Sequence, residues 1–272
     1  MMEALLAALA GLLIGSFLNV CIYRLPRDLS VVKPRSFCPE CNQMISWFDN
    51  IPVVSYMVLA GRCRRCGHRI SARYPIVELL TAVAFFWSVR DLGTTLAALK
   101  FCVFGAILIA LVFSDLEERI LPDEFTLGGT ALGVIFAAFV PLKGGFLRLI
   151  FLSPTNERWI SLCDSLLAAA FCGGALWAVG ALYEKIRHRE GLGLGDVKMV
   201  MMVGAFLGVQ GALLTLIAGS LLGAIVGLCY IWFTDKDAST YELPFGTFLG
   251  VSALCVGFLG EVVFNWYSRL GA

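Results

Sequence analysis

Long runs of apolar residues, separated by short polar segments, make up most of this chain. About twenty apolar residues cross a bilayer as a helix, and several of the runs reach that length. Two runs are shorter, and each is divided from a neighbouring apolar run only by a weak polar interruption. The pattern predicts an all-α polytopic membrane protein with about eight transmembrane helices. The predicted segments are Glu3–Cys21, Pro75–Val89, Thr94–Ser114, Phe125–Pro141, Ile160–Tyr183, Val197–Val209, Gly211–Phe233 and Pro244–Val263.

The composition agrees with this class, because 59% of the residues are hydrophobic, 15% are charged and the mean hydropathy is +0.83. The first apolar run is long enough to be compared with a secretory signal. Glu3 is its only charge before Arg24, and no convincing small-residue cleavage site follows it. We therefore expect this run to be a retained transmembrane helix.

Lys and Arg are distributed unevenly between the segments that connect the predicted helices. With eight spans, 15 of them fall on the side that includes residues 24–74, and 6 fall on the other side. An excess of Lys and Arg marks the cytoplasmic side of a membrane protein. The distribution predicts that residues 24–74 are cytoplasmic and that both termini lie outside.

Three parts follow from this pattern: a first transmembrane helix (1–23), a polar cytoplasmic insert (24–74) and a helical membrane bundle (75–272). The bundle is rich in glycine, and small residues four apart allow helices in lipid to approach closely. Residues Leu142–Trp159 form a predicted outside loop to which no chemistry is assigned. The glycines in question are Gly173, Gly174, Gly219, Gly223 and Gly227.

The insert carries two Cys-x-x-Cys pairs, Cys38 with Cys41 and Cys63 with Cys66. Paired cysteines of this kind supply four thiolates in tetrahedral geometry, which suits a structural zinc ion. The insert has few large apolar residues, so a bound metal would stabilise it. Disulfides or a redox pair are the alternatives, and the reducing cytoplasm makes them less favourable. A zinc ion with four thiolate ligands has no open position, so no catalytic role is assigned to it.

Two aspartates lie where predicted helices meet water on the cytoplasmic side. Asp115 follows the span Thr94–Ser114, and Asp196 begins its span after Gly193 and Gly195. An ionisable group at membrane depth is costly and is therefore a functional candidate. Two close carboxyl groups would share one proton, so one could activate water while the other polarised a carbonyl, as in aspartic proteases. The two glycines would permit close packing and unusual backbone dihedrals.

Other interpretations of these carboxylates remain open at this point. Both aspartates could simply cap helices, since Asp196 would be stabilised by a helix dipole. Asp123 and Asp164 are rival second carboxylates. Asp164 lies on the opposite side in the predicted topology, and Asp123 is a plausible N-cap eight residues after Asp115.

With these residues identified, the chain resembles the type IV prepilin peptidase (prepilin leader peptidase/N-methyltransferase) family over nearly its whole length. The segments that carry the resemblance are Gly15–Val20 with Tyr23–Pro26, both cysteine pairs, Arg73–Leu79, Asp115–Asp123 and Gly193–Lys198. The combination is highly specific, whereas Gly-x-Gly-Asp alone would be weak.

The resemblance implies a multi-pass enzyme of the bacterial inner membrane with its active site facing the cytoplasm. Such an enzyme cuts the leader from type IV prepilins or pseudopilins and then methylates the new N-terminus with S-adenosylmethionine. It implies that Asp115 and Asp196 are catalytic, and it gives no reason to expect a nucleic-acid partner. The residues expected to shape the site are Gly193, Gly195, Lys198, Pro122 and Asp123.

The methyl-donor site is not predicted by any local motif, because the chain has no strand, glycine-rich turn and helix of the nucleotide-binding kind. We hypothesise that the insert and nearby spans form it. Glu78 and Asn19 are weak candidates, since both are polar near the cytoplasmic ends of their spans, and a packing hydrogen bond is the simpler interpretation of each.

Two other classes of function are compatible with parts of the pattern. One is an ion-coupled transporter with a zinc-stabilised regulatory insert, although such proteins usually show repeated halves with sites at the bilayer midplane. The other is a scaffold of a pilus or secretion machine without chemistry of its own. Replacing either aspartate by asparagine would discriminate between them and the peptidase.

Overall fold

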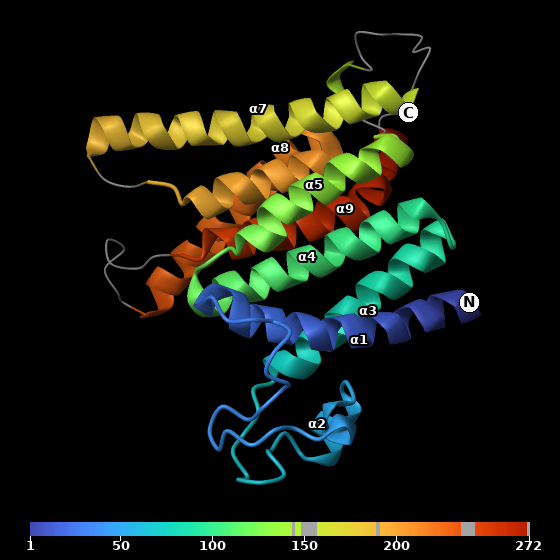
Figure 1. Cartoon of the computed structure of the whole chain (residues 1–272). Coiled ribbons are helices and arrows are strands. Elements are labelled where there is room, and N and C mark those ends of the chain that lie inside the picture. The colour runs from blue at the N-terminus through green and yellow to red at the C-terminus, as the bar shows by residue number, and fades with distance from the viewer. Residues whose placement is uncertain (143–144, 148–156, 189–190, 235–242, 271–272) are drawn as a thin grey trace. The chain divides into compact units, whose positions relative to one another are not determined.

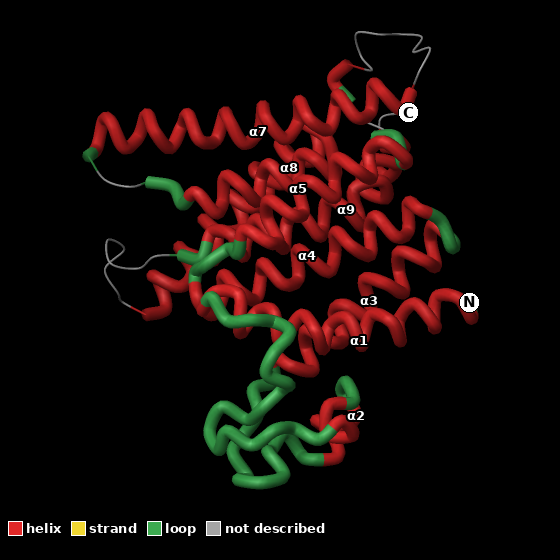
Figure 2. The backbone as a smooth tube through the Cα atoms, viewed as in Figure 1, coloured by secondary structure: helices red, strands yellow, loops and turns green. Residues whose placement is uncertain are grey.

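The computed structural model describes residues 1–142, 145–147, 157–188, 191–234 and 243–270, and in this part of the chain every regular element is helical (Figures 1 and 2). The chain folds as two compact units, Met1–Ser114 and Asp115–Ala272. Most of the predicted outside loop Leu142–Trp159 lies outside the described residues. The helical class is therefore as the hydrophobic pattern predicted.

In the first unit, α1 (Met2–Arg24) packs along α3 (Arg73–Leu92). The two helices approach closely at Gly11 and Gly15. A Cβ atom added at either glycine would lie only 2.7 Å from a backbone Cα atom of α3. The Asn19 amide also donates to the carbonyl oxygen of Tyr74 (3.0 Å), at the start of α3. Small residues and one buried amide thus fix the two helices together.

The insert between α1 and α3 is mostly loop (Figure 2). Its regular elements are short: η1 (Leu25–Arg27), η2 (Trp47–Asn50) and α2 (Val54–Val58). Two antiparallel bridges, Phe37 with Met44 and Arg62 with Arg69, each close a tight turn. With so little regular structure, the insert depends on side-chain contacts and on its cysteines for order.

The second unit is a bundle in which α8 (Leu194–Thr234) packs against α5 (Asp123–Phe139), α7 (Glu157–Arg187) and α9 (Phe245–Leu270) (Figure 1). Glycines lie at these contacts, as the sequence predicted. A Cβ atom at Gly219, Gly223 or Gly227 would lie 2.6 to 3.3 Å from side chains of Leu249, Phe248 or Leu243. Gly174, by contrast, meets nothing within 4 Å. α4 (Leu96–Glu118) begins in the first unit and ends in the second.

Helix α8 is broken at Gly208, whose φ of 76° is accessible mainly to glycine. Leu121 contacts both Gly195 and Gly246, and Gly227 contacts Leu243. Residues 195 and 227 therefore lie at the same end of the unit, although a straight helix would separate them by about 48 Å. The chain reverses at Gly208, which makes α8 two antiparallel segments. The sequence predicted two segments here but placed the break at Gln210-Gly211.

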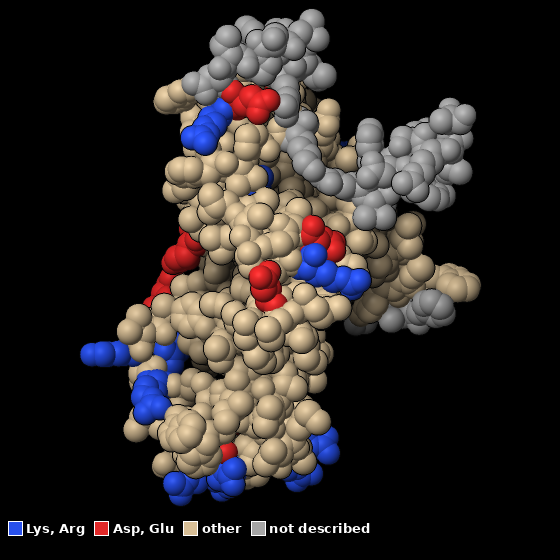
Figure 3. All heavy atoms as spheres, turned by 90° about the vertical axis from the view of Figure 1, so that its right-hand side faces the viewer, with Lys and Arg blue, Asp and Glu red and all other residues tan. Residues whose placement is uncertain are grey.

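Each of the eight predicted apolar runs is thus helical within the described residues. Among the helices that the structure describes, four are long and apolar enough to cross a membrane, and Phe245–Gly260 is a shorter apolar helix. Figure 3 shows Lys and Arg gathered over the insert, whereas most of the other described surface on this face is uncharged. These features are those of a multi-pass membrane protein, and the count of eight spans stays a prediction. The four helices are found in Met2–Arg27, Leu96–Glu118, Glu157–Arg187 and Leu194–Tyr230.

Candidate functional site

Asp115 lies in the last turn of α4 and is 5% exposed. Its Oδ2 atom accepts two hydrogen bonds from Thr247, one from the backbone N–H at 2.6 Å and one from the hydroxyl at 2.8 Å. Thr247 is in the first turn of α9, where backbone N–H groups have no partner within the helix. The carboxylate of Asp115 therefore occupies the N-terminus of α9, a position that favours negative charge.

Asp196 lies in the first turn of α8, and its backbone N–H donates to the carbonyl oxygen of Gly193. The loop residue Leu121 joins the two aspartates. A Cβ atom at Gly195 would lie 3.1 Å from Leu121 Cβ, and one at Gly246 would lie 2.9 Å from Leu121 Cδ1 and 3.1 Å from Asp115 Cγ. The Asp115 carboxylate also acts electrostatically on Asp196. The structure thus brings the ends of α4, α8 and α9 together with both carboxyl groups among them.

Of the two glycines before Asp196, only Gly195 makes the close contact that the sequence suggested. Within the described residues, neither Gly193 nor Gly195 has a positive φ angle. The unusual dihedrals that these glycines would permit are therefore not used as positive φ angles at either position, and Gly195 lies within α8, which begins at Leu194. The contribution of Gly195 is the absence of a side chain, which allows Leu121 to approach.

Asp123 is not a free carboxylate. Its two oxygens accept hydrogen bonds from Lys198 Nζ at 2.7 and 2.9 Å. Asp123 begins α5 directly after Pro122, and Lys198 is the fifth residue of α8. The ion pair joins the N-terminal ends of these two helices. Asp123 therefore makes a contact that positions α5 and α8.

Asp164 is buried and hydrogen-bonded to the backbone. It is 3% exposed and accepts a hydrogen bond from the backbone N–H of Leu147 at 2.7 Å. One turn earlier in α7, Ser161 donates to the carbonyl oxygen of Ala137 near the C-terminal end of α5. Asp164 therefore lies near the end of α5 opposite to Asp123, as its predicted sidedness requires.

The four insert cysteines form one cluster, in which all the Sγ atoms lie within 4.8 Å of one another. The Sγ atoms of Cys38 and Cys66 are 3.9 Å apart. Tetrahedral zinc with bonds of about 2.3 Å would require about 3.8 Å between sulfurs. A disulfide would require about 2.0 Å, and all four are free thiols. The geometry fits a metal ion held by Cys38, Cys41, Cys63 and Cys66.

The two cysteine pairs share one backbone design. Cys38 and Cys63 donate their N–H groups to Gln43 and His68, and the residue after each second cysteine has a positive φ angle. Those residues are Asn42 (53°) and Gly67 (72°), the types that tolerate this conformation.

The thiols of this cluster do not ionise equally. Backbone N–H groups of Cys66 and Arg65 lower the pKa of Cys63 to about 7. At Cys66 the His68 N–H lowers the pKa, but burial and the neighbouring thiols outweigh it and raise the pKa to about 11. Four thiols this close cannot all become negative without a cation, and a divalent metal ion would supply that charge.

Asn19 and Glu78 make packing contacts. The Asn19 amide donates to Gly15 and Tyr74 carbonyl oxygens. Glu78 is 6% exposed, and its Oε2 atom accepts a hydrogen bond from the Val53 N–H at 2.7 Å. Asn19 thus joins α1 to α3, and Glu78 joins α3 to the insert, as expected for packing hydrogen bonds.

Thr247 and Gly246 were not among the predicted site residues. The signal available in the sequence is Pro244, since proline is frequent at a helix start, followed by the predicted segment Pro244–Val263. That segment begins on the same predicted side as both aspartates. A helix N-terminus there is a ready position for a carboxylate.

Comparisons with known proteins identify the family to which the chain is similar. Residues 9–92 match the model of the bacterial peptidase A24 N-terminal domain, and residues 102–228 match that of the type IV leader peptidase family. A prepilin leader peptidase/N-methyltransferase from Legionella pneumophila is 34% identical over 97% of this chain and 93% of its own length. One from Aeromonas hydrophila is 35% identical over 96% and 92%, respectively.

A third relative, from Pseudomonas aeruginosa, is 32% identical over 95% of this chain and 91% of its own length and has the same name. No solved structure gives a significant match. Similarity of this extent covers both units, including the cysteine cluster and the aspartates. The chain belongs to the prepilin leader peptidase/N-methyltransferase family.

Proposed function

We propose that this protein is a membrane aspartic endopeptidase that removes the leader of type IV prepilins or pseudopilins and then methylates the new N-terminus. The observation that carries the proposal is the meeting of Asp115 and Asp196 around Leu121, where three helices end. Two interacting carboxyl groups at the end of an apolar bundle are suited to acid–base hydrolysis of a peptide bond.

The two carboxyl groups have different roles in this proposal. Asp115 accepts two hydrogen bonds from Thr247 at a helix N-terminus, so it is the ionised member and takes a proton from water. The water oxygen bonds to the scissile carbonyl carbon as Asp196 gives its proton to the carbonyl oxygen. The C–N bond then breaks, the leaving nitrogen receives the proton held by Asp115, and one hydroxyl proton of the tetrahedral intermediate returns to Asp196. Asp115 is then again ionised and Asp196 again protonated.

Neighbouring contacts support this arrangement without taking part in proton transfer. The ion pair between Lys198 and Asp123 fixes α5 and α8 beside the aspartates, and Pro122 sets the start of α5. Gly195 and Gly246 leave the space that Leu121 occupies. These residues position the carboxyl groups.

The cysteine cluster holds a structural zinc ion in this proposal. Four thiolates fill the tetrahedral shell and leave no position for water. The metal stabilises an insert that has little regular structure, and it takes no part in the cleavage step.

The site faces the cytoplasm of a bacterial inner membrane in this proposal. The sidedness rests on the distribution of Lys and Arg, which is densest in residues 24–74. Prepilins and pseudopilins are the proposed substrates, because relatives of the chain are named for prepilin leaders. Their enzyme names also disfavour an ion-coupled transporter.

The proposal is tested with purified full-length protein, a prepilin peptide with its leader and S-adenosylmethionine labelled in the methyl group. Both leader cleavage and transfer of label to the new N-terminus are expected, in that order. Absence of cleavage by a folded, zinc-loaded protein would refute the peptidase. Cleavage without transfer of label would refute the methyltransferase alone.

A further inference from the structure

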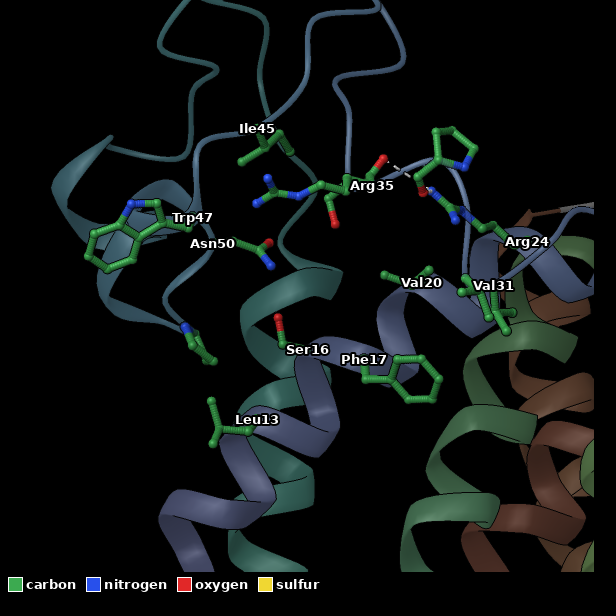
Figure 4. A pocket seen from close by; sticks show the side chains of 14 residues that line it. Leu13, Ser16, Phe17, Val20, Arg24, Val31, Arg35, Ile45, Trp47 and Asn50 are labelled. Carbon is green, nitrogen blue, oxygen red and sulfur yellow. Dashed lines mark hydrogen bonds between the residues drawn. The ribbon is translucent and has the colours of Figure 1, made fainter.

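A pocket of about 380 Å³ lies in the first unit between the C-terminal half of α1 and the insert (Figure 4). This volume is within the range of small-molecule sites. Phe17 and Val20 of α1 line one side of the pocket, and Arg35 and Asn50 of the insert line another. The candidate catalytic aspartates belong to the other unit, so the pocket is not part of their site.

Arg24, in the last turn of α1, is a buried cation among the lining residues. It is 4% exposed, and its guanidinium donates to the carbonyl oxygens of Ser30 and Pro34 at 2.8 Å each. Among the residues that the structure describes, no carboxylate forms an ion pair with it. Carbonyl oxygens satisfy N–H groups but do not neutralise the charge, and a buried charge is costly unless it is paired. Arg24 therefore favours an anion in the adjoining cavity.

Arg35 supplies a second positive charge. Its side chain extends toward Asn50 (Figure 4), and within the described part of the chain no carboxylate pairs with it. The lining residues include no Asp or Glu. Glu78 of α3 is not one of them, and its carboxylate accepts hydrogen bonds from the Ser16 hydroxyl and the Val53 N–H. The two guanidinium groups therefore give the pocket a positive potential, which suits a carboxylate or a phosphate.

An exposed apolar stripe on α1 leads into the pocket. Its residues are three or four positions apart, so they lie on one face of the helix, and they are 50–64% exposed: Leu6, Leu9, Leu13 and Phe17. Leu13 and Phe17 are also lining residues. Because α1 is long and apolar enough to cross a membrane, this stripe is suited to contact with acyl chains. The pocket thus continues an apolar surface that a bilayer would cover.

The insert has the surface of a segment that meets a membrane. Trp47 of η2 and Met57 and Val58 of α2 are each 73% exposed, and the Trp47 ring points away from the cavity (Figure 4). Lys and Arg gather over the same insert (Figure 3). Tryptophan is enriched at membrane–water interfaces, and basic segments beside a transmembrane helix are attracted to anionic lipids. The pocket therefore lies where lipid headgroups are expected.

We infer that this pocket binds one anionic phospholipid, whose phosphate lies between Arg24 and Arg35 and whose acyl chain follows Leu13 and Phe17. A lipid of this class has the two ends that the lining requires, a negative headgroup and a hydrocarbon chain. A free phosphate ion would leave the apolar walls without a partner, and a zwitterionic lipid would neutralise the two arginines less completely. The bound lipid links α1 to the insert, and its binding is separate from the proposed peptidase and methyltransferase chemistry.

The test is a lipid titration of purified full-length protein in detergent, with bound lipid counted by native mass spectrometry. Phosphatidylglycerol should bind about tenfold or more tightly than phosphatidylcholine with the same acyl chains. Arg35→Ala should weaken phosphatidylglycerol binding roughly tenfold, because it removes a charge-assisted contact to the phosphate. Arg69→Ala removes an equal charge from an exposed insert position outside the lining, so it is the matched control and should bind as the wild type does.

Asn50→Asp is a second variant, and it preserves the shape of the side chain. It places a carboxylate in front of Arg35 (Figure 4), so an internal ion pair competes with the lipid phosphate. Phosphatidylglycerol binding should fall by a factor similar to that of Arg35→Ala. Wild-type zinc content and an unchanged thermal unfolding midpoint would show that the insert of each variant is folded.

Equal binding of phosphatidylglycerol by the wild type, Arg35→Ala and Asn50→Asp would overturn the inference. Equal binding of phosphatidylglycerol and phosphatidylcholine would also overturn it, because charge would then not select the occupant. Displacement of phosphatidylglycerol by millimolar inorganic phosphate would assign the pocket to a soluble anion and would overturn the lipid site as well.

Discussion

At the scale of single residues, Thr247 makes the two candidate catalytic aspartates unequal. Both its backbone N–H and its hydroxyl donate to Asp115. Asp115 also interacts electrostatically with two charged groups, Asp196 and Arg119. Hydrogen bonds to an ionised carboxylate contribute about 1.5–3 kcal/mol each, enough to decide which carboxyl group keeps the shared proton.

Thr247→Val removes the hydroxyl donor but keeps the shape and the backbone N–H. Leader cleavage at neutral pH should fall about tenfold, and the acidic limb of its pH profile should move to higher pH by about one unit, because one hydrogen bond to the ionised carboxylate is lost. Rates measured from pH 5 to 9 would check this.

Thr247→Ser is the conservative control and should restore both rate and pH profile, since the hydroxyl is retained. A Thr247→Val enzyme that is slower with an unmoved acidic limb would assign Thr247 a packing role only.

Sequence patterns identified Asp115 and Asp196 but not Thr247, for a physical reason. A carboxylate at the end of an apolar run stands out because it is costly there. A threonine in the first turn of a helix is common and carries no such signal. Its role depends on a contact between residues 132 positions apart, which no local periodicity encodes.

At the scale of elements, the two cysteine pairs act as one unit with the metal. Cys38→Ser leaves three thiolates, so the zinc content of the purified protein should fall from about one ion per chain to a small fraction of that. The metal content of the purified protein, measured by mass spectrometry, checks this effect.

Cys163→Ser, at an exposed cysteine of α7, should keep its zinc. Full zinc content in the Cys38→Ser protein would contradict the four-thiolate site.

The contact of α1 with α3 gives a second test at this scale. Gly11→Leu would place a side chain against the backbone of Ala82, so the protein should lose about 2–3 kcal/mol of stability, as overpacked contacts do. Gly174→Leu faces open space on α7 and is the matched control. Thermal unfolding in detergent should show a lower midpoint for the first variant only, and equal midpoints would contradict the packing described.

The helices themselves were largely predictable, because apolar runs of this length have few alternatives to a membrane helix. The residues at which these helices begin and end were less predictable. α7 extends to Arg187 and α8 begins at Leu194, each beyond the predicted apolar run, since helical hydrogen bonding continues past the lipid core. The break in α8 falls at Gly208 rather than at Gln210-Gly211, because several neighbouring residues could have ended the helix and tertiary packing selects one.

At the scale of the whole molecule, the reversal at Gly208 bears on the predicted topology of eight spans. In that prediction α8 supplies two of the spans, so the number of crossings is even and both termini lie on the side opposite to the insert. A single long α8 would give seven crossings and opposite termini. The basic insert is predicted to be cytoplasmic.

Reporter fusions test this topology directly. Alkaline phosphatase, which is active only outside the cytoplasm, should be active when fused after Ala272 and inactive when fused within the insert. A fluorescent protein that folds only in the cytoplasm should give the reverse pattern. An inactive phosphatase at the C-terminus would contradict the reversal.

The central claim, that Asp115 and Asp196 act together in leader cleavage, is tested most directly by the rate of cleavage of a prepilin peptide by Asp115→Asn and Asp196→Asn. Each should lose roughly a hundredfold or more in rate while zinc content and methyl-donor binding stay normal. Glu124→Gln, at an exposed carboxylate of α5, should cleave at the wild-type rate. Full leader cleavage by a folded Asp196→Asn protein would contradict the account.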